Sequence, residues 1–261
     1  MRIICLALTA CILASPAWAD DDNEKAEQAR IGNAIDVAFG ATVVSDYLDG
    51  GETRSGGKPS FQVYAEPTYG MLYVGVRFAT VDMRADDDDD GGEDEEELPA
   101  AEDEEDGPAS KLETTLYAGI RPQLGPVELD LGVEHLIYEG LSSIDDTTLH
   151  AEAEYEFNDR LSFEGEVEYS LREENWQIEA ATELGIFEKA VLYAAVGHEF
   201  GGEEESVNYW TAGARYDFND VLSASAGYYG ADNGLSKAVA ALTVKTSYNR
   251  LNGAPAAADD D

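Results

Sequence analysis

Between Thr148 and Leu171 the chain alternates apolar with charged or polar residues, interrupted once at Asn158-Asp159-Arg160. Side chains of a β-strand point to opposite faces with a period of two, so this pattern predicts a hairpin with one apolar and one acidic face. Each strand is about ten residues long, which is the length that a tilted strand needs to cross a bilayer. The pattern recurs along most of the chain and predicts a membrane-spanning β-barrel.

About twelve strands of this kind follow one another between residues 34 and 248. The connections between them alternate in length, with short turns such as 158–160 and longer segments such as 47–59. Short periplasmic turns at one rim and longer extracellular loops at the other are typical of outer-membrane barrels. We therefore expect an all-β fold, a closed antiparallel transmembrane barrel. The predicted strands are 34–46, 60–67, 71–83, 112–121, 126–138, 147–157, 161–171, 176–185, 190–200, 206–218, 221–230 and 237–248.

The first residues indicate secretion. Arg2 is followed by an apolar run from Ile3 to Leu13 and by Ala17-Trp18-Ala19, which is the pattern of a signal peptide removed after residue 19. A lipoprotein signal ending at Cys11 is the alternative. Residues 20–33 are then a flexible acidic lead-in and residues 249–261 a flexible Ala/Asp tail. The barrel pattern behind a signal peptide predicts the outer membrane of a Gram-negative bacterium.

The formal net charge is −39, from 55 acidic and 16 basic residues. Such a field repels the phosphate backbone, so nucleic acid is excluded as a partner. Small cations or other small solutes, together with outer-membrane lipid, are the expected partners. The sequence also allows a homo-oligomer.

If the apolar parity faces lipid, the charged parity must face the lumen, because charges on the lipid face cost several kcal/mol near the bilayer midplane. A carboxylate-lined lumen would favour cations, and its conductance should fall on acidification. The basic side chains could form a ladder opposite the carboxylates or fill the lumen as ion pairs. The acidic candidates are Glu128, Asp130, Glu134, Glu152, Glu154, Glu156, Glu164, Glu166, Glu168, Glu179 and Glu183, and the basic candidates are Arg77, Arg121, Arg215 and Lys245.

Residues 84–111 are so rich in Asp and Glu that we expect a disordered loop. Asp86, Asp88, Asp90 and Glu97 have the spacing of an EF-hand calcium loop. The flanking segments have strand patterns, whereas an EF-hand needs helices. We therefore expect no specific metal site and no cofactor, only weak attraction of divalent cations.

Aromatic residues gather near strand ends. Tyr138, Tyr169, Trp176, Trp210 and Tyr228 would form a belt at one membrane interface, where amphipathic rings are favoured. Cross-strand pairing in a soluble core is the alternative explanation.

Few features of the sequence support a catalytic function. His135, His150 and His198 are far apart and lack metal-binding spacing, so each is expected to be an ordinary strand residue. No nucleophile motif or phosphate-binding glycine loop is present. We expect no enzymatic activity.

Four segments form a further pattern, namely Val44-Ser45-Asp46-Tyr47-Leu48, Gly57-Lys58-Pro59-Ser60-Phe61-Gln62, Tyr73-Val74-Gly75 and Val81-Asp82. Together they resemble the TorF-type porin family of Gram-negative bacteria. The resemblance implies an outer-membrane barrel with porin activity. The chain departs from the family pattern at Asp49-Gly50-Gly51, where members have Phe-Arg-Gly, in the acidic insertion after Asp82, and in lacking a terminal aromatic residue.

The leading hypothesis is a porin-like channel for passive, cation-preferring diffusion of small solutes through an acidic lumen. Two alternatives stay open. One is a plugged or structural outer-membrane barrel with a cation-binding acidic loop, and the other is a soluble periplasmic β-protein that responds to calcium.

Overall fold

The structure is a computed structural model that describes residues 35–84, 109–202 and 205–251. Twelve long strands form its wall, and three short strands, a 3-10 turn and a short helix lie between or after them. The long strands are β1 (Ile35–Val44), β4 (Ser60–Tyr69), β5 (Leu72–Arg84), β6 (Ala109–Ile120), β8 (Val127–Tyr138), β9 (Asp146–Asn158), β10 (Leu161–Ser170), β11 (Asn175–Phe187), β12 (Ala190–Gly201), β13 (Val207–Asp217), β14 (Leu222–Ala231) and β15 (Ser236–Ser247). The short elements are β2 (Leu48–Asp49), β3 (Glu52–Thr53), β7 (Gln123–Leu124), η1 (Ser142–Ile144) and α2 (Tyr248–Leu251).

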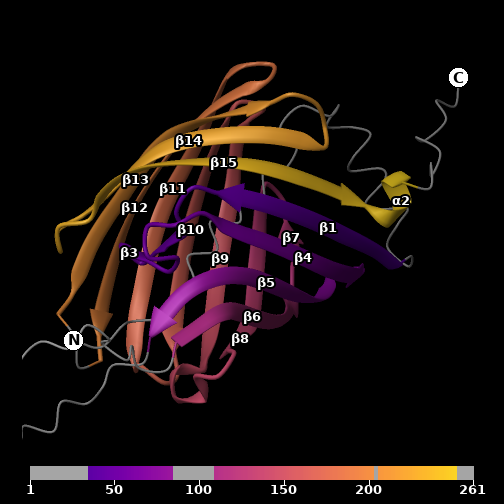
Figure 1. The fold of residues 1–261 in the computed structure, drawn as a ribbon. Helices are drawn as coiled ribbons and strands as arrows, with labels where there is room; N and C mark the ends of the chain where they lie inside the picture. The colour runs from indigo at the N-terminus through magenta and orange to yellow at the C-terminus, as the bar shows by residue number, and fades with distance from the viewer. Residues whose placement is uncertain (1–34, 85–108, 203–204, 252–261) are drawn as a thin grey trace, which may run out of the picture.

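The sheet closes on itself. Each long strand pairs antiparallel with its neighbours, β1 lies between β4 and β15, and the pairing of β6 with β8 completes the ring. Figure 1 shows the resulting barrel, in which the first and last strands lie side by side. Closure leaves no unpaired sheet edge, which a bilayer would not tolerate. The prediction of a closed antiparallel barrel of about twelve strands is confirmed.

All twelve predicted strands are present, with ends that differ by up to a few residues. The largest correction of a turn concerns Pro67, where we expected β4 to stop. β4 continues to Tyr69, since Thr68 and Tyr69 pair with Tyr73 and Leu72 of β5. Pro67 itself forms no pair with β5, so its missing N–H interrupts the pairing without ending the strand.

Three predicted segments lie wholly or mostly outside the described residues. These are the signal peptide 1–19, the lead-in 20–33 and the acidic loop 84–111 with its four EF-hand-like residues. The strands β5 and β6 reach into the predicted loop, so that only 85–108 is left between them. The predicted tail 249–261 begins within α2, whose last described residue is Leu251. Within the described ranges, no helix is long and apolar enough to cross a bilayer.

The apolar parity of the strands is the exposed one, as the alternation predicts. Leu131 on β8 is 42% exposed, Phe163 on β10 47% and Ile178 on β11 44%. Their neighbours of the opposite parity, such as Glu134 and Glu168, are partly or fully buried. Large apolar side chains exposed on the outside of a closed barrel form a surface suited to lipid rather than water.

Three members of the predicted aromatic belt are exposed on the barrel surface, whereas Tyr138 is not, so its place in the belt is wrong. Trp176, Trp210 and Tyr228 are each close to half exposed, and the rings of Trp210 and Tyr228 lie 5.7 Å apart. Tyr138 is only 1% exposed and packs inside the barrel instead. Tyr138 belongs to the buried parity of β8, together with Leu136, so its ring points away from lipid.

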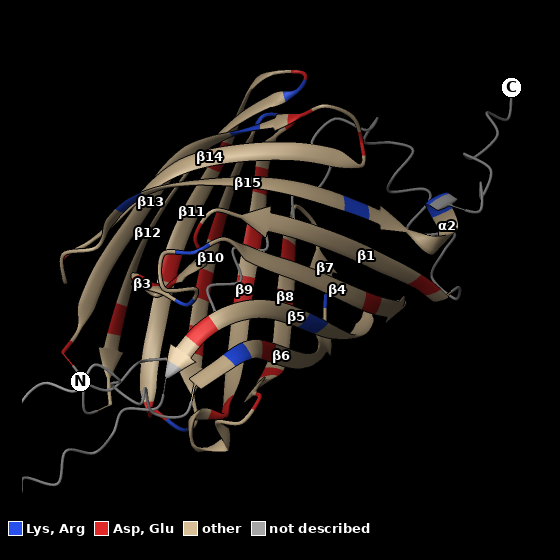
Figure 2. Ribbon diagram, in the orientation of Figure 1, with Lys and Arg blue, Asp and Glu red and all other residues tan. Residues whose placement is uncertain are grey.

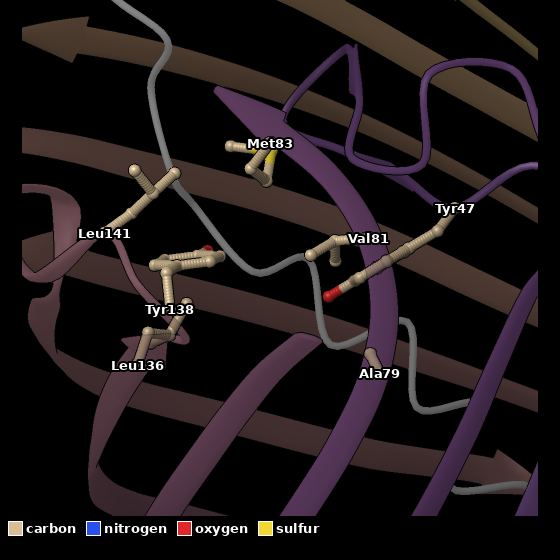
Figure 3. Close-up of a cluster of buried hydrophobic side chains, with 7 residues drawn as sticks. All are labelled: Tyr47, Ala79, Val81, Met83, Leu136, Tyr138 and Leu141. Carbon is tan, nitrogen blue, oxygen red and sulfur yellow. The ribbon is translucent and has the colours of Figure 1, made fainter. Parts of the chain in front are cut away.

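A cluster of buried hydrophobic side chains lies inside the barrel beside β5 and β8 (Figure 3). Tyr47, from the connection between β1 and β4, packs there with residues of both strands. This connection, residues 45–59, was expected among the longer outer loops. Its Tyr47, Asp49, Arg54 and Ser55 are each less than a tenth exposed, so the segment folds into the barrel. The cluster consists of Tyr47, Ala79, Val81, Met83, Leu136, Tyr138 and Leu141.

Candidate functional site: the barrel interior

The inserted segment 45–59, called the inner loop below, is held by a buried ion pair. The guanidinium of Arg54 donates two hydrogen bonds to Asp49 Oδ2, one of them from Nε at 2.9 Å. Its Nη1 donates a third, at 3.0 Å, to the hydroxyl of Tyr138 on β8. Burial raises the pKa of Asp49 to about 7, against the opposing effect of the Arg54 guanidinium.

The inner loop contacts strands on two sides of the barrel. On one side Tyr47 donates a hydrogen bond of 3.2 Å to Glu113 on β6. On the other side Lys237 on β15 donates one of 2.5 Å to Asp46, and a Cβ on Gly51 would meet the side chains of Ala231 and Tyr209. Since β6 and β15 are separated by β1, β4 and β5 along one arc of the wall, the loop bridges the interior and narrows it at the end that carries the longer connections.

A cavity that is partly open to solvent lies against six consecutive strands from β4 to β10. Three tyrosines, two arginines and a histidine line it, namely Tyr64, Tyr73, Tyr117, Arg77, Arg121 and His150. Six carboxylates complete the lining, namely Glu66, Asp130, Glu134, Glu152, Glu166 and Glu168. Against two guanidinium groups these carboxylates leave a formal excess of four negative charges.

Arg121, which directly follows β6, is the centre of a network in this cavity. Its guanidinium donates to Glu66 on β4 at 2.6 Å and to Asp130 on β8 at 2.7 Å, and it lies 3.9 Å above the ring of Tyr73. Tyr73 donates a hydrogen bond of 2.5 Å to Asp130, and His150 Nε2 lies 3.4 Å from the same carboxylate. The sequence treated His150 as an isolated strand residue. Only the register of β8 and β9 reveals that it joins this network.

The other arginines are also paired with acids. Arg77 lies 3.8 Å from Glu134 and donates a hydrogen bond of 3.2 Å to Thr115. Arg215 on β13 forms a two-pronged pair with Glu183 on β11, at 2.9 and 3.1 Å. Arg77 and Arg121 therefore share one cavity, whereas Arg215 lies on a distant part of the wall. The interpretation as ion pairs holds, and a single continuous arginine ladder does not form.

Lys245, the fourth basic candidate, belongs to β15. It lies in register with Gly40 of β1 and has the less exposed parity of its strand, opposite to Val244.

The acidic candidates form rows across neighbouring strands. The register places Asp130, Glu152, Glu166 and Glu179 opposite one another on β8, β9, β10 and β11. A second row contains Glu128, Glu154 and Glu164. Figure 2 shows the acidic residues as successive bands on these strands. Like charges placed directly opposite destabilise a sheet, so such rows need a reason beyond folding.

The candidates differ in how deeply they lie. Glu168 is 4% exposed, whereas Glu128 and Glu156, toward the short-turn end, are exposed. The remaining acidic candidates are half-buried. The register thus brings the predicted acids onto one face of four adjacent strands.

Tyrosine–glycine pairs are an interior feature that the sequence analysis missed. Tyr117 on β6 lies opposite Gly75 on β5, and Tyr209 on β13 lies opposite Gly197 on β12. A Cβ on Gly75 or Gly197 would lie 2.1 or 2.0 Å from the tyrosine Cζ, so each ring lies flat over its glycine. These rings line the interior without protruding far into it. A signal was present, since glycine and tyrosine recur on the parity that carries the acids, but the register needed to pair them was not.

Among the described residues, no group of three or more His, Cys, Asp or Glu side chains is arranged to hold a metal ion. Asp86, Asp88, Asp90 and Glu97 lie outside those residues.

Solved structures with this fold are outer-membrane porins. A KdgM porin matches with a TM-score of 0.52 at 6% identity, covering 82% of this chain and 98% of the porin. The same porin in complex with disordered oligogalacturonate matches with a TM-score of 0.50, also at 6% identity and with the same coverage. No protein-family model matches the sequence, and no curated protein matches it. At this identity the similarity establishes the fold alone.

The closed barrel, its exposed apolar parity and the fold that it shares with these porins make the chain an outer-membrane β-barrel.

Proposed function

We propose that the protein is a porin-like channel for passive, cation-preferring diffusion of small solutes. One observation carries the proposal: the cavity inside the closed barrel is lined by six carboxylates but only two guanidinium groups. Buried charges without a partner of opposite sign destabilise a fold, so the additional acids do not serve the stability of the barrel.

The excess carboxylates would act through the electrostatic potential that they create. Rings of acidic side chains in a narrow aqueous passage lower the energy of a cation there and raise that of an anion. The rows on β8 to β11 supply such a one-sided field over a large part of the wall. Arg77, Arg121 and Arg215 each lie against a carboxylate and so contribute little attraction for anions.

The KdgM porin is described with oligogalacturonate, which is a chain of acidic sugars. The acidic rows of this chain would repel such a solute. We therefore transfer the passage of small solutes to this protein but not that substrate.

A plugged barrel is the second candidate, because the inner loop bridges the interior at the end with the longer connections. In that case the acidic interior would serve structure or cation storage rather than passage. Membership of the TorF-type porin family, suggested by Val44-Ser45-Asp46-Tyr47-Leu48 and the following motifs, remains part of the proposal.

Planar-bilayer recording in a tenfold KCl gradient tests the proposal. We expect open channels whose reversal potential has the sign of K⁺ permeation, with a preference that weakens in the triple variant Glu152→Gln/Glu154→Gln/Glu164→Gln. The matched control is Glu139→Gln, which removes an exposed carboxylate beyond the end of β8. An anion-preferring reversal potential would contradict the proposal, and a barrel without conductance would support the plugged alternative. Heat-modifiable migration on gels verifies that each variant is folded.

A further inference from the structure

Three carboxylates of the cavity have no basic partner among the described residues. They are Glu152 on β9 and Glu166 and Glu168 on β10, and Glu152 lies directly opposite Glu166 in the register. The other three differ, because Arg121 pairs with Glu66 and Asp130 and Arg77 pairs with Glu134. The cavity therefore has two sides. On β4 to β8 its carboxylates form ion pairs with arginines, whereas on β9 and β10 they have no arginine or lysine partner among the described residues.

Glu168 provides independent evidence for a binding position in this part of the cavity. It is 4% exposed, and its Oε2 is buried without a hydrogen-bond partner. Gln177, directly opposite on β11, is 1% exposed, and both polar atoms of its amide also lack a partner. A buried polar group left unsatisfied costs free energy, so a cluster of such atoms beside a cavity indicates a place where a hydrogen-bonding group binds.

The chemistry of that group follows from its surroundings. The carboxylates accept hydrogen bonds and repel anions, so the group must donate and must be positive. No metal geometry is present in the described residues. Glu152 lies on β9 and Glu166 and Glu168 lie on β10, so acceptors from two neighbouring strands face the same cavity. Several N–H donors spread over an ammonium or guanidinium group can serve such acceptors together.

The opposite side of the cavity suits the rest of such a molecule. Tyr64 and Tyr117 lie flat over Gly40 and Gly75 and present ring faces, and Tyr73 already carries the Arg121 guanidinium on its ring. Tyrosine rings attract cations and cover carbon chains. A molecule with a positive end and a short carbon skeleton would thus find complementary surfaces on both sides.

We propose that Glu152, Glu166 and Glu168 form a binding subsite for the ammonium or guanidinium group of a small organic cation, with its carbon skeleton against the tyrosine rings. The inference rests on the proposed channel function and specifies its substrate class. Passage of inorganic cations would then be the background activity, and organic cations would pause at this subsite.

Single-channel recording of the full mature barrel in symmetric KCl, with agmatine as the probe, tests the subsite. Agmatine carries a guanidinium and an ammonium on a four-carbon chain, and urea serves as the neutral, planar comparison. We expect agmatine to interrupt the current, urea to have no effect, and Glu168→Gln to raise the half-blocking concentration of agmatine at least tenfold. Glu166→Gln provides a second variant should Glu168→Gln fail to fold.

The matched control is Glu156→Gln. It removes the same charge from the same face of β9, but Glu156 is exposed and does not line the cavity. We expect its half-blocking concentration to change less than twofold. Absence of block in the wild type, or equal weakening in Glu156→Gln and Glu168→Gln, would overturn the subsite, since the second result indicates a diffuse field alone.

The two proposals can fail separately. A cation-selective reversal potential without agmatine block would refute the subsite and leave the channel function in place. An anion-selective reversal potential would refute the channel function as proposed, whatever agmatine does.

Discussion

Removing the guanidinium of the inner loop should release the loop from the barrel interior. In Arg54→Met the side chain remains long enough to fill its place, but Asp49 loses the guanidinium that donates two hydrogen bonds to it. Both side chains are at most 1% exposed, so no water replaces the lost hydrogen bonds. The seated loop would then bury a carboxylate without that partner at any pH at which Asp49 is ionised.

The magnitude follows from that burial. Breaking a buried ion pair by removing one partner costs about 3–5 kcal/mol. At about 1.4 kcal/mol per factor of ten, the equilibrium between seated and displaced loop should shift about a hundred- to several-thousand-fold. The effect should grow as the pH rises above about 7, because Asp49 is then ionised in the wild type and the variant must either bury that charge alone or take up a proton against the higher pH.

Hydrogen–deuterium exchange of the amides of residues 46–57, together with single-channel conductance at pH 8, measures this shift. We expect faster exchange and a larger conductance in Arg54→Met. The double variant Asp49→Leu/Arg54→Met should restore protection, because an apolar pair replaces both charges at once. Lys58→Met is the control, since Lys58 is 67% exposed in its pair with Asp82 and such pairs are worth about 0–1 kcal/mol.

Unchanged exchange in Arg54→Met would refute the conclusion that this ion pair seats the loop. A double variant as unprotected as the single one would show that the loop depends on Arg54 for some reason other than charge compensation.

Further predictions concern pH, packing and selectivity. The raised pKa of Asp49 means that the seated loop binds a proton more tightly than a displaced loop with an ordinary pKa, so seating is most favoured at low pH and weakens as the pH rises from the ordinary value of 3.8 to about 7. Wild-type conductance should therefore rise between about pH 4 and pH 7 and level off above it, and a recording of Asp49→Asn should lack that rise. In Gly197→Val the new side chain collides with the Tyr209 ring, which should cost about 1–3 kcal/mol and lower the temperature at which the folded band disappears on heat-modifiability gels. An unchanged transition temperature would show that the ring is free to move. Arg121→Gln leaves Glu66 and Asp130 without their guanidinium, so reversal-potential measurements should show stronger cation preference, and a shift toward anions would contradict the assignment of Arg121 as a charge compensator.

The architecture is readable from the sequence because its signal is local. Alternation from Thr148 to Leu171 assigns every side chain of a hairpin to one face or the other, and a bilayer permits only a closed sheet with the apolar face outward. Alternating short and long connections then orient the strands. The parity of Glu152, Glu166 and Glu168 follows from the same rule, without any knowledge of partners.

The neighbours of each acidic side chain, in contrast, depend on contacts between distant parts of the chain. The register that aligns Asp130, Glu152, Glu166 and Glu179 depends on strand pairing, and a shift of one residue would move each side chain to the other face. The pairing of Arg121 with Glu66 joins residues 55 positions apart.

The inner loop shows most clearly what depends on tertiary contacts rather than on local sequence. Nothing in residues 45–59 distinguishes a loop in solvent from one in the barrel, because its polar composition suits both. It is seated by Lys237, Glu113 and Tyr138, which approach it only once the barrel has closed. Local alternation thus specifies the wall of this barrel, whereas only the closed fold specifies what lies inside one of its ends.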